Sequence, residues 1–374
     1  MSQFDFIVIG AGMAGASVAS ELAAHSTVLM LEAETQAGYH TTGRSAALFT
    51  RAYGPAPIRA LTRASEAFLR APDSPWLDGP LLTKRRAMYV ARADQQVAYQ
   101  ALQDELGDAV KPLGGAEAMG LVPLFREGHI KNALIDETAS DVDVNALHQH
   151  FLREFRARGG TTKLKARVER LERTGQSWTV TASGEEFKAG AIINAAGAWC
   201  DEVAQMAGSA GLGLVPKRRT VLLVDCPPEH DSDGWPMVID AQEEFFMKPE
   251  AGKLLISPAD ETPSSPCDAQ PEDFDIAVCV DRIERTFEIS IARIDQKWAG
   301  LRSFFSDKSP VAGYDPVLPG FFWLAGQGGY GIQTAPALAR LSAALALGNS
   351  VPADILSHGV SAADLAPDRP ALSR

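Results

Sequence analysis

The sequence of 374 residues lacks the features that mark membrane-spanning, secreted and nucleic-acid-binding proteins. No apolar run reaches the ~20 residues that a spanning helix needs. The first residues lack the basic start of a signal peptide, so we expect a cytoplasmic protein, with peripheral association to the inner membrane left open. Basic residues number 35 against 47 acidic ones, and the net charge of -12 argues against nucleic acid as a partner.

Cysteine is scarce, and the common metal-binding motifs are missing. The seven histidines form no H-E-x-x-H motif, and His148 and His150, two apart on a predicted helix, do not share a face. We therefore predict no metal site. No pair of cysteines has C-x-x-C spacing, which indicates reduced thiols at Cys200, Cys226, Cys267 and Cys279. A hydrophobic fraction of 46% predicts a globular chain, and its length allows two domains.

The first 32 residues show the strand–turn–helix–strand pattern of a dinucleotide site. An apolar run of strand length, 4–9, leads into G-x-G-x-x-G at 10–15, and a helical stretch then connects to a second strand at 27–31. The glycines permit the tight turn, the close approach of a pyrophosphate and the packing of the helix on the strand. Glu32 follows the second strand, where its carboxylate can accept from both ribose hydroxyls. The motif's position at the start of the chain favours FAD over NAD.

Three further segments combine glycine with other small residues. Residues 41–47 surround one arginine and suit a second approach to a phosphate or flavin ring, although an ordinary helix start capped by Thr42 is the alternative. Residues 195–199 follow a strand at 191–194 and form a second crossing from strand to helix. Residues 326–331 hold four glycines in six residues between a strand and a helix. That glycine content has a large entropic cost, so we expect the backbone there to approach something large and flat.

The rest of the chain alternates between helical and strand patterns. Apolar spacing predicts a helix over 145–158, and apolar runs predict strands over 164–171 and 220–224. A stretch rich in Pro, Asp and Ser, 258–275, predicts a surface loop.

Seven stretches of the sequence carry a resemblance that covers nearly the whole chain. They are residues 38–40, 42–47, 194–201, 216–219, 235–237, 298–304 and 327–334. Together they resemble the FAD-dependent amino-acid oxidoreductases of the D-amino acid oxidase family, which includes glycine oxidase and sarcosine oxidase. Within that family the chain resembles the bacterial D-arginine dehydrogenases.

The resemblance implies an α/β fold with two domains. A Rossmann-like FAD-binding domain is built from the discontinuous segments 1–80, 140–215 and 303–374, and an inserted α+β substrate domain with a mixed sheet comprises 81–139 and 216–302. The implied activity is oxidation of a D-amino acid by hydride transfer from Cα to FAD. The resulting imino acid hydrolyses to a 2-oxo acid and ammonia, and a quinone or another acceptor takes the electrons.

Two other functions stay open from the sequence. One is an oxidase of a secondary amine such as sarcosine, of glycine, or of a 2-hydroxy acid. The other is a flavin-carrying protein without turnover. We expect non-covalent FAD because no cysteine lies beyond Cys279 to form the C-terminal link of sarcosine oxidases, which leaves His40 as the one N-terminal residue to watch.

The resemblance also implies which residues bind the cofactor. They are Gly10, Gly12, Met13, Ala14, Gly15, Glu32, Ala33, Thr42, Gly43, Arg44, Ser45, Ala46, Ala47, Val168, Ala196, Gly197, Trp199, Gly328, Gly329, Tyr330, Gly331, Ile332, Gln333 and Thr334.

For the substrate, the resemblance implies a carboxylate held by Arg219 and Arg302, whose guanidinium forks suit a planar carboxylate. Without the resemblance, the residues themselves favour another interpretation, in which Arg219 is a solvated member of a basic run and Arg302 belongs to a structural ion pair. Tyr53 is implied to lie near the amine, and the Gly329 carbonyl to accept an amine hydrogen. The implied pocket residues are Leu48, Thr50, Ala87, Met237, Ile239, Phe246 and Tyr330.

Three pocket positions depart from the D-arginine dehydrogenases. Those enzymes carry a glutamate, a tyrosine and a histidine where this chain has Ala87, Phe246 and Leu48. Each change removes a polar group, so we predict D-amino acid substrates with neutral, mainly apolar side chains.

Overall fold

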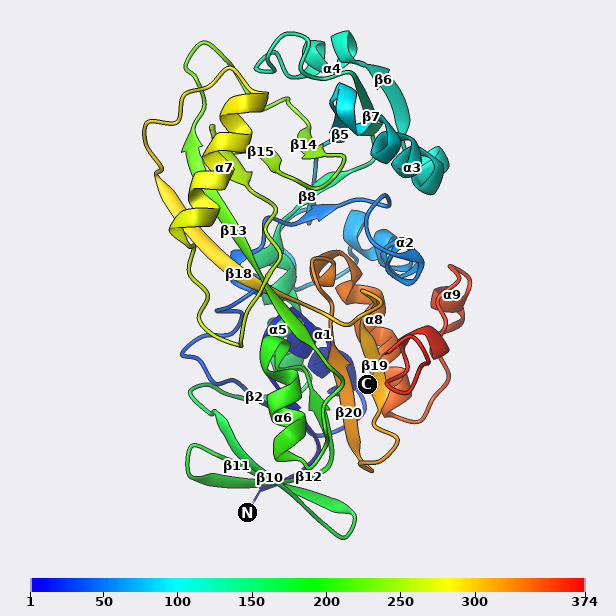
Figure 1. Ribbon diagram of the computed structural model, residues 1–374. Coiled ribbons are helices and arrows are strands. Elements are labelled where there is room, and N and C mark those ends of the chain that lie inside the picture. Colours follow the sequence, from blue (N-terminus) through cyan, green and yellow to red (C-terminus); the bar gives the residue numbers. More distant parts are fainter. Residues whose placement is uncertain (1, 373–374) are drawn as a thin grey trace.

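The computed structural model describes residues 2–372, and two large sheets dominate it, one above the other in Figure 1. The lower sheet has eight strands and the upper sheet nine. A small three-stranded sheet lies between them: β3 (Leu48–Phe49), β8 (Ser140–Val142) and β4 (Leu82–Lys84). The predicted α/β class is confirmed, while the predicted domain boundaries stay a prediction.

The lower sheet has a parallel centre. In order it contains β9 (Thr161–Lys163), β2 (Val28–Leu31), β1 (Ser2–Ile9), β12 (Glu185–Asn194) and β20 (Phe321–Ala325). Antiparallel strands extend it on two sides. β19 (Val311–Tyr314) pairs with β20, β11 (Ser177–Ala182) pairs with the first half of β12, and β10 (Val168–Thr174) pairs with β11. The predicted strand at 164–171 is therefore wrong in part, because Lys165, with φ of 54°, lies in a turn between β9 and β10.

Helices cover both faces of the lower sheet, as its apolar strands require. Val8 and Ile193 face one apolar cluster, while Ile7 and Ile192 face another. The first face is covered by α1 (Met13–Leu22), α8 (Gly331–Ala346) and α9 (Ala353–Leu356), and α2 (Ala56–Arg70) and α5 (Val144–Ala157) pack on α8 and α1. The second face is covered by α6 (Cys200–Met206). The predicted helix at 145–158 is confirmed as α5.

The upper sheet is mixed. Its order is β18 (Gln296–Phe304), β13 (Val215–Asp225), β16 (Lys253–Ser257), β15 (Phe246–Glu250), β14 (Met237–Asp240), β5 (Ala87–Ala91), β7 (Asn132–Asp136) and β6 (Lys111–Gly114). The short β17 (Thr262–Pro263) pairs with the start of β13, inside the stretch predicted as a surface loop. Three helices accompany the sheet: α3 (Gln96–Leu106), α4 (Gly115–Leu121) and α7 (Asp273–Thr286).

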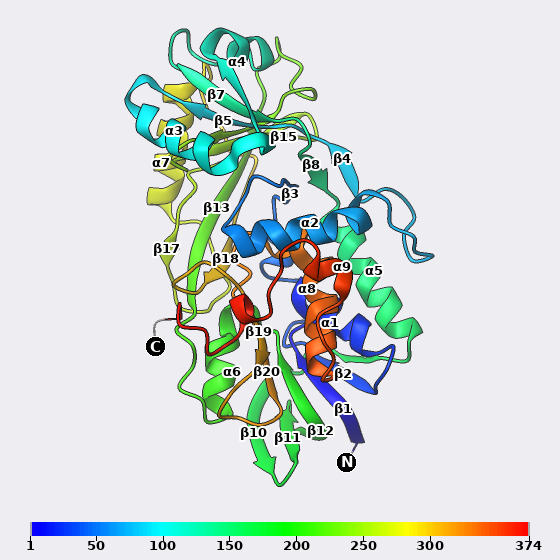
Figure 2. The same ribbon diagram turned by 90° about the vertical axis from the view of Figure 1, so that its right-hand side faces the viewer.

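Two long strands connect the levels of the molecule. In Figures 1 and 2, β13 and β18 run side by side from the upper sheet down toward the lower one. Five short 3-10 turns complete the fold: Thr42–Arg44, Ala93–Gln95, Gly107–Ala109, Gly197–Trp199 and Ala363–Leu365. Among the described residues, no helix is long and apolar enough to cross a membrane.

Candidate active site

A cavity of about 350 Å³ lies between the two large sheets. Its floor is formed by the carboxyl ends of the parallel strands, at Ile9, Leu31 and Leu324, and its other walls come from β13, β14, β15 and β18. In open α/β sheets, ligands bind beyond the carboxyl ends of the strands, so the cavity is where the fold places a cofactor.

The glycine motif after β1 builds a cradle that no other residue fits. Gly10 has φ of 101°, and a Cβ on it would lie 2.5 Å from the Ala195 carbonyl oxygen. A Cβ on Gly15 would lie 1.9 Å from the Gly10 carbonyl oxygen, so helix α1 packs directly on the turn. The Met13 N–H at the start of α1 donates to Thr42 Oγ1 at 2.9 Å. The Thr42 hydroxyl thus accepts from the start of α1, and no side chain caps the 3-10 turn Thr42–Arg44.

Glu32 lines the cavity beside this cradle and is only 9% exposed. Its two carboxylate oxygens accept from the Ala11 N–H at 2.8 Å and from the Glu34 N–H at 2.9 Å. Buried His148 donates from Nε2 to the Ala11 carbonyl oxygen at 2.9 Å, and burial lowers the pKa of His148, so the ring is neutral. The sequence does not indicate this role of His148, because the apolar spacing of its helix does not show which residues the ring contacts.

Most residues implied to bind the cofactor line the cavity. Besides Glu32 and Gly10 these are Gly12, Met13, Ala14, Ala33, Thr42, Arg44, Ser45, Ala46, Ala47, Val168, Ala196, Gly197, Trp199, Gly328, Gly329, Gly331 and Ile332. Arg44 also lines the cavity. Its guanidinium group donates to the carbonyl oxygens of Ala269 and Ala299 and pairs with Asp268.

Five implied cofactor residues do not line the cavity. The side chain of Gln333 bonds to Thr50 and Thr62, and the Thr334 hydroxyl donates to the Tyr330 carbonyl within the first turn of α8. The others are Gly15 and Gly43, which are tightly packed on the carbonyl oxygens of Gly10 and Gly38, and buried Tyr330.

The run Lys217-Arg218-Arg219 lies on β13, where side chains alternate between faces. Arg218 turns to α7 and donates to Asp275 Oδ2 at 2.9 Å. Arg219 turns to the cavity, and Arg302 on β18 pairs in register with Lys217, so it lies on the same face as Arg219. Arg219 is therefore not solvated: it is 9% exposed.

We call Arg219 and Arg302 the clamp. Burial and the charge of Arg302 lower the pKa of Arg219 to about 10. Burial would also lower the pKa of Arg302, but Tyr53 and Glu261 raise it. Arg302 Nη1 donates to the Tyr53 hydroxyl at 3.3 Å. Two cations that line a cavity, one buried and the other partly buried, can together accommodate an anion.

The glycine-rich loop before α8 presses on the clamp. A Cβ on Gly329 would lie 2.8 Å from Arg302 Nη1 and 3.1 Å from the Tyr53 hydroxyl. Gly328 serves a different purpose, since a Cβ there would lie 2.2 Å from the ring of Phe304. Packing against aromatic rings thus accounts for part of the glycine content.

Apolar side chains line the cavity beyond the clamp. The implied pocket residues Leu48, Met237, Ile239 and Phe246 are among them. Val221, Phe245, Ala259 and Tyr89 also line this part and were not predicted, because strand patterns do not show which face meets a cavity.

Two implied pocket residues do not line the cavity, and the hydroxyl of a third is bonded to other groups of the protein. Ala87 is fully buried in β5 and does not line the cavity, and neither does Tyr330, whose ring packs on Tyr53. Thr50 lines it, but its hydroxyl donates to buried Asp136 Oδ2 at 2.6 Å and accepts from the Ala52 N–H.

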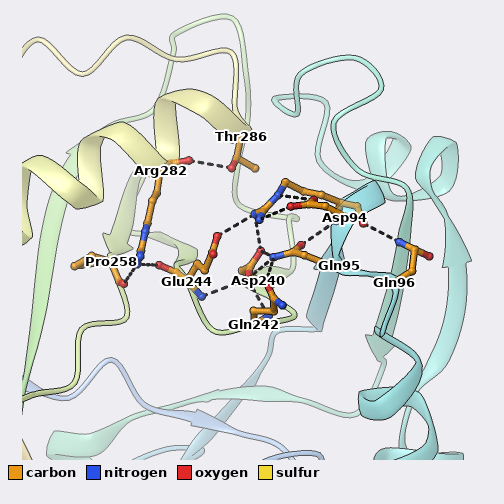
Figure 3. A network of polar contacts seen from close by, with 10 residues as sticks. Asp94, Gln95, Gln96, Asp240, Gln242, Glu244, Pro258, Arg282 and Thr286 are labelled. Atoms are coloured by element: carbon orange, nitrogen blue, oxygen red, sulfur yellow. Dashed lines mark hydrogen bonds and ion pairs between the residues drawn. The ribbon is translucent and has the colours of Figure 1, made fainter. Parts of the chain in front are cut away.

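Three acidic residues that line the cavity, Glu34, Glu202 and Glu243, were not predicted. Glu243 lines the cavity from the turn between β14 and β15, with φ of 58°. Figure 3 shows the network around this turn: the Asp240 carboxylate accepts from Gln95 and from the Gln242 backbone N–H, and Arg282 donates to the carbonyl oxygens of Glu244 and Pro258. The turn is therefore firmly held. Nothing in the local sequence pattern indicates that Glu243 reaches the cavity.

Comparisons with known proteins agree with this geometry. A protein-family model described as "FAD dependent oxidoreductase" matches residues 5–345. The chain is similar to FAD-dependent oxidoreductase domain-containing protein 1 of Xenopus laevis, with 30% identity over 170 residues, or 41% of this chain. The match spans 34% of the Xenopus protein, about a third of its length.

Two solved structures share the fold. Glycine oxidase from Geobacillus kaustophilus has a TM-score of 0.79 at 20% identity, covering 94% of this chain and 99% of that one. L-α-glycerophosphate oxidase from Mycoplasma pneumoniae, dithionite-reduced with FAD bound, has a TM-score of 0.83 at 18% identity, covering 93% and 95%. The cofactor is FAD, and the cradle at Gly10 and Gly15, the start of α1 and the Glu32 carboxylate fit it.

Proposed function

Because this chain belongs to the FAD-dependent oxidoreductase family, we propose that it is a D-amino acid dehydrogenase whose substrates have neutral, mainly apolar side chains. The observation that carries the proposal is the clamp, the buried Arg219 and the partly buried Arg302, which both line the cofactor's cavity. When bound, FAD supplies the acceptor for the hydride that leaves the substrate Cα. The imino acid product hydrolyses in water to a 2-oxo acid and ammonia.

The protein's own groups bind and orient the substrate. The clamp binds the carboxylate, since guanidinium forks match a planar carboxylate in geometry and charge. The Tyr53 hydroxyl accepts from Arg302, so it lies beside the clamp, where an α-amino group attached to the bound carboxylate comes within reach. We assign the Gly329 carbonyl to the same amino group. The closeness of Gly329 to Arg302 and Tyr53 supports this assignment.

The apolar walls support the side-chain preference. Leu48, Met237, Ile239 and Phe246 surround the space that a substrate side chain enters. Each Å² of apolar surface buried there stabilises the complex by about 25 cal/mol. A guanidinium group would lose its water among these residues, and an unpaired buried charge costs several kcal/mol. A neutral side chain is therefore favoured over a charged one.

Glu243 is the observation that favours a second candidate. Glu243 lines the cavity. Burial is the main cause that raises the pKa of Tyr89 and Tyr330, and the charge of Glu243 adds a small contribution to both. A substrate with an amino or guanidino group on its side chain would find a partner there. The apolar walls are more numerous, so we rank the neutral substrates first.

An anaerobic substrate screen tests the proposal. D- and L-amino acids, sarcosine, glycine and 2-hydroxy acids are mixed with the yellow holoenzyme, and bleaching of the flavin is followed. We expect D-leucine, D-methionine or D-phenylalanine to bleach it fastest. Bleaching by sarcosine, glycine or 2-hydroxy acids alone would contradict the proposal, and hydrogen peroxide formation in air would indicate an oxidase instead of a dehydrogenase that uses a quinone or dye.

The two candidates differ in their response to Glu243→Gln. We expect kcat/KM for D-leucine to change little and to exceed that for D-arginine by roughly 100-fold, about 2.7 kcal/mol. If D-arginine is the better substrate and loses activity in this variant, the second candidate is correct. Glu244→Gln is the matched control, because the neighbouring Glu244 carboxylate pairs with Arg92 at 3.0 Å and does not line the cavity.

A further inference from the structure

A carboxylate of the protein itself stands behind the clamp. Glu261, the residue before β17, accepts at Oε1 from Arg302 Nη2 at 3.0 Å and from Arg219 Nη2 at 3.3 Å. Its Oε2 accepts from Lys217 Nζ at 2.8 Å. Both arginines line the cavity and Glu261 does not, so its carboxylate contacts them from outside the cavity.

The bonds to Glu261 leave the clamp free to bind another carboxylate. A guanidinium group has five N–H donors. Arg219 uses one for the Asp260 carbonyl oxygen and one for Glu261, while Arg302 uses one for Tyr53 and one for Glu261. Three N–H donors remain on each arginine. Glu261 therefore does not use up the donors that a substrate carboxylate needs.

Electrostatics require such a partner. Partial burial would raise the pKa of Glu261, but the hydrogen bond from Lys217 and the charges of Arg302, Lys217 and Arg219 lower it, so the carboxylate is ionised at neutral pH. Without this charge, the clamp arginines would repel each other with no shared partner. Long, charged side chains in that situation turn toward other acceptors or water, and the clamp would lose its geometry.

We propose that Glu261 is a positioning residue of the clamp, and that Lys217 in turn positions Glu261. Glu261 holds both guanidinium groups in the orientation that receives the substrate carboxylate. The inference rests on the proposed function, because it assigns the clamp to a carboxylate. It adds a residue from the stretch at 258–264 to a site otherwise built from strands and the glycine loop.

Binding of a simple carboxylate tests this role without turnover. 4-Methylpentanoate, which is leucine without its amino group, is titrated into the holoenzyme while the flavin absorbance is followed. We expect Glu261→Gln to raise the Kd of 4-methylpentanoate, and the KM of the best amino acid, by about 10-fold or more. This effect lies between the effects of losing an exposed ion pair and a buried one. FAD content stays normal, and kcat changes much less than KM.

Lys217→Met should raise the Kd in the same direction by a smaller factor, and combining it with Glu261→Gln should add little, because the two act through one contact. Because this variant retains the Glu261 side chain, it also tests the inference if Glu261→Gln does not fold. Glu272→Gln is the matched control: Glu272 pairs with Arg218 on the opposite face of the same strand, so the Kd should not move.

The outcomes separate the inference from the proposed function. An unchanged or lowered Kd in Glu261→Gln, with a raised Kd in Arg219→Met and Arg302→Met, overturns the role of Glu261 alone. An unchanged Kd in both arginine variants overturns the clamp, and with it the proposed carboxylate site. A raised Kd in Glu272→Gln equal to that in Glu261→Gln would show a general loss of structure and also overturn the inference.

Discussion

The clamp gives the sharpest prediction, because its two arginines have different neighbours. Arg302 contacts both Glu261 and the Tyr53 hydroxyl, while Arg219 contacts Glu261 and the Asp260 carbonyl. Replacing either with Met keeps an apolar stem but removes the charge and the donors. We expect kcat/KM to fall by an amount that corresponds to roughly 2–5 kcal/mol of transition-state binding. This is the cost of removing one member of a buried charged contact.

The two variants should divide this loss differently between binding and turnover. Arg302→Met also frees the Tyr53 hydroxyl, which we assign to the amino group, so the rate of flavin reduction at saturating substrate should fall with it. Arg219→Met leaves the contact between Arg302 and Tyr53 intact, so it should act mainly through a weaker substrate Kd. Arg302→Met also removes the positive charge that, after burial, lowers the pKa of Arg219.

Anaerobic stopped-flow reduction measures both quantities, since the dependence of the rate on substrate concentration yields the Kd and the limiting rate. FAD content, from the absorbance ratio of flavin to protein, should equal that of the wild type. A change in kcat/KM below about threefold, well under 1 kcal/mol, would show that the clamp does not bind the substrate carboxylate. Equal effects on Kd and limiting rate in both variants would refute the separate role of Tyr53.

Three further predictions concern the cofactor and the clamp's charge. Acid precipitation should release the yellow colour into the supernatant, and colour retained in the pellet would disprove non-covalent FAD. Gly15→Ala should lower FAD content and cost about 2–3 kcal/mol of stability, because its Cβ would lie 1.9 Å from a backbone oxygen, whereas Gly79→Ala, with open space around it, should change neither. The affinity for 4-methylpentanoate should fall about fivefold between pH 10 and pH 11, because Arg219, with a pKa of about 10, loses its charge as pH rises. Arg302→Met should move this fall to higher pH, since the repelling charge is gone, and a fall at the same pH would contradict the cause we assign.

Most residues that were predicted to bind the cofactor line the cavity, and the reason is physical. The determinants of this half of the site are local: the residues from Gly10 to Gly15 fix a turn and a helix start, and Glu32 follows one short helix and strand later. The same local logic recovered β1, β2, β12 and β20, whose apolar runs are buried on both faces.

The substrate half was harder because its determinants are not local. Period-two alternation puts Arg218 and Arg219 on opposite faces, but only the packing of α7 shows that Arg218 is the one turned away from the cavity. Glu261 lay in a stretch predicted as a surface loop, and Glu243 in a tight turn. Ala87 was placed in the pocket by resemblance, yet β5 buries it completely.

The position of the clamp depends on strand register as much as on the arginines themselves. On β13, a shift of one residue would turn Arg218 into the cavity and Arg219 toward α7. Two contacts oppose this shift: Asp275 on α7 accepts from Arg218, and the Asp260 carboxylate accepts from the Thr220 N–H and hydroxyl. Because β18 pairs with β13 over its whole length, the same contacts also fix Arg302. The acidic residues Asp260 and Asp275 therefore determine which arginine of the basic run lines the cavity, although neither of them lines it.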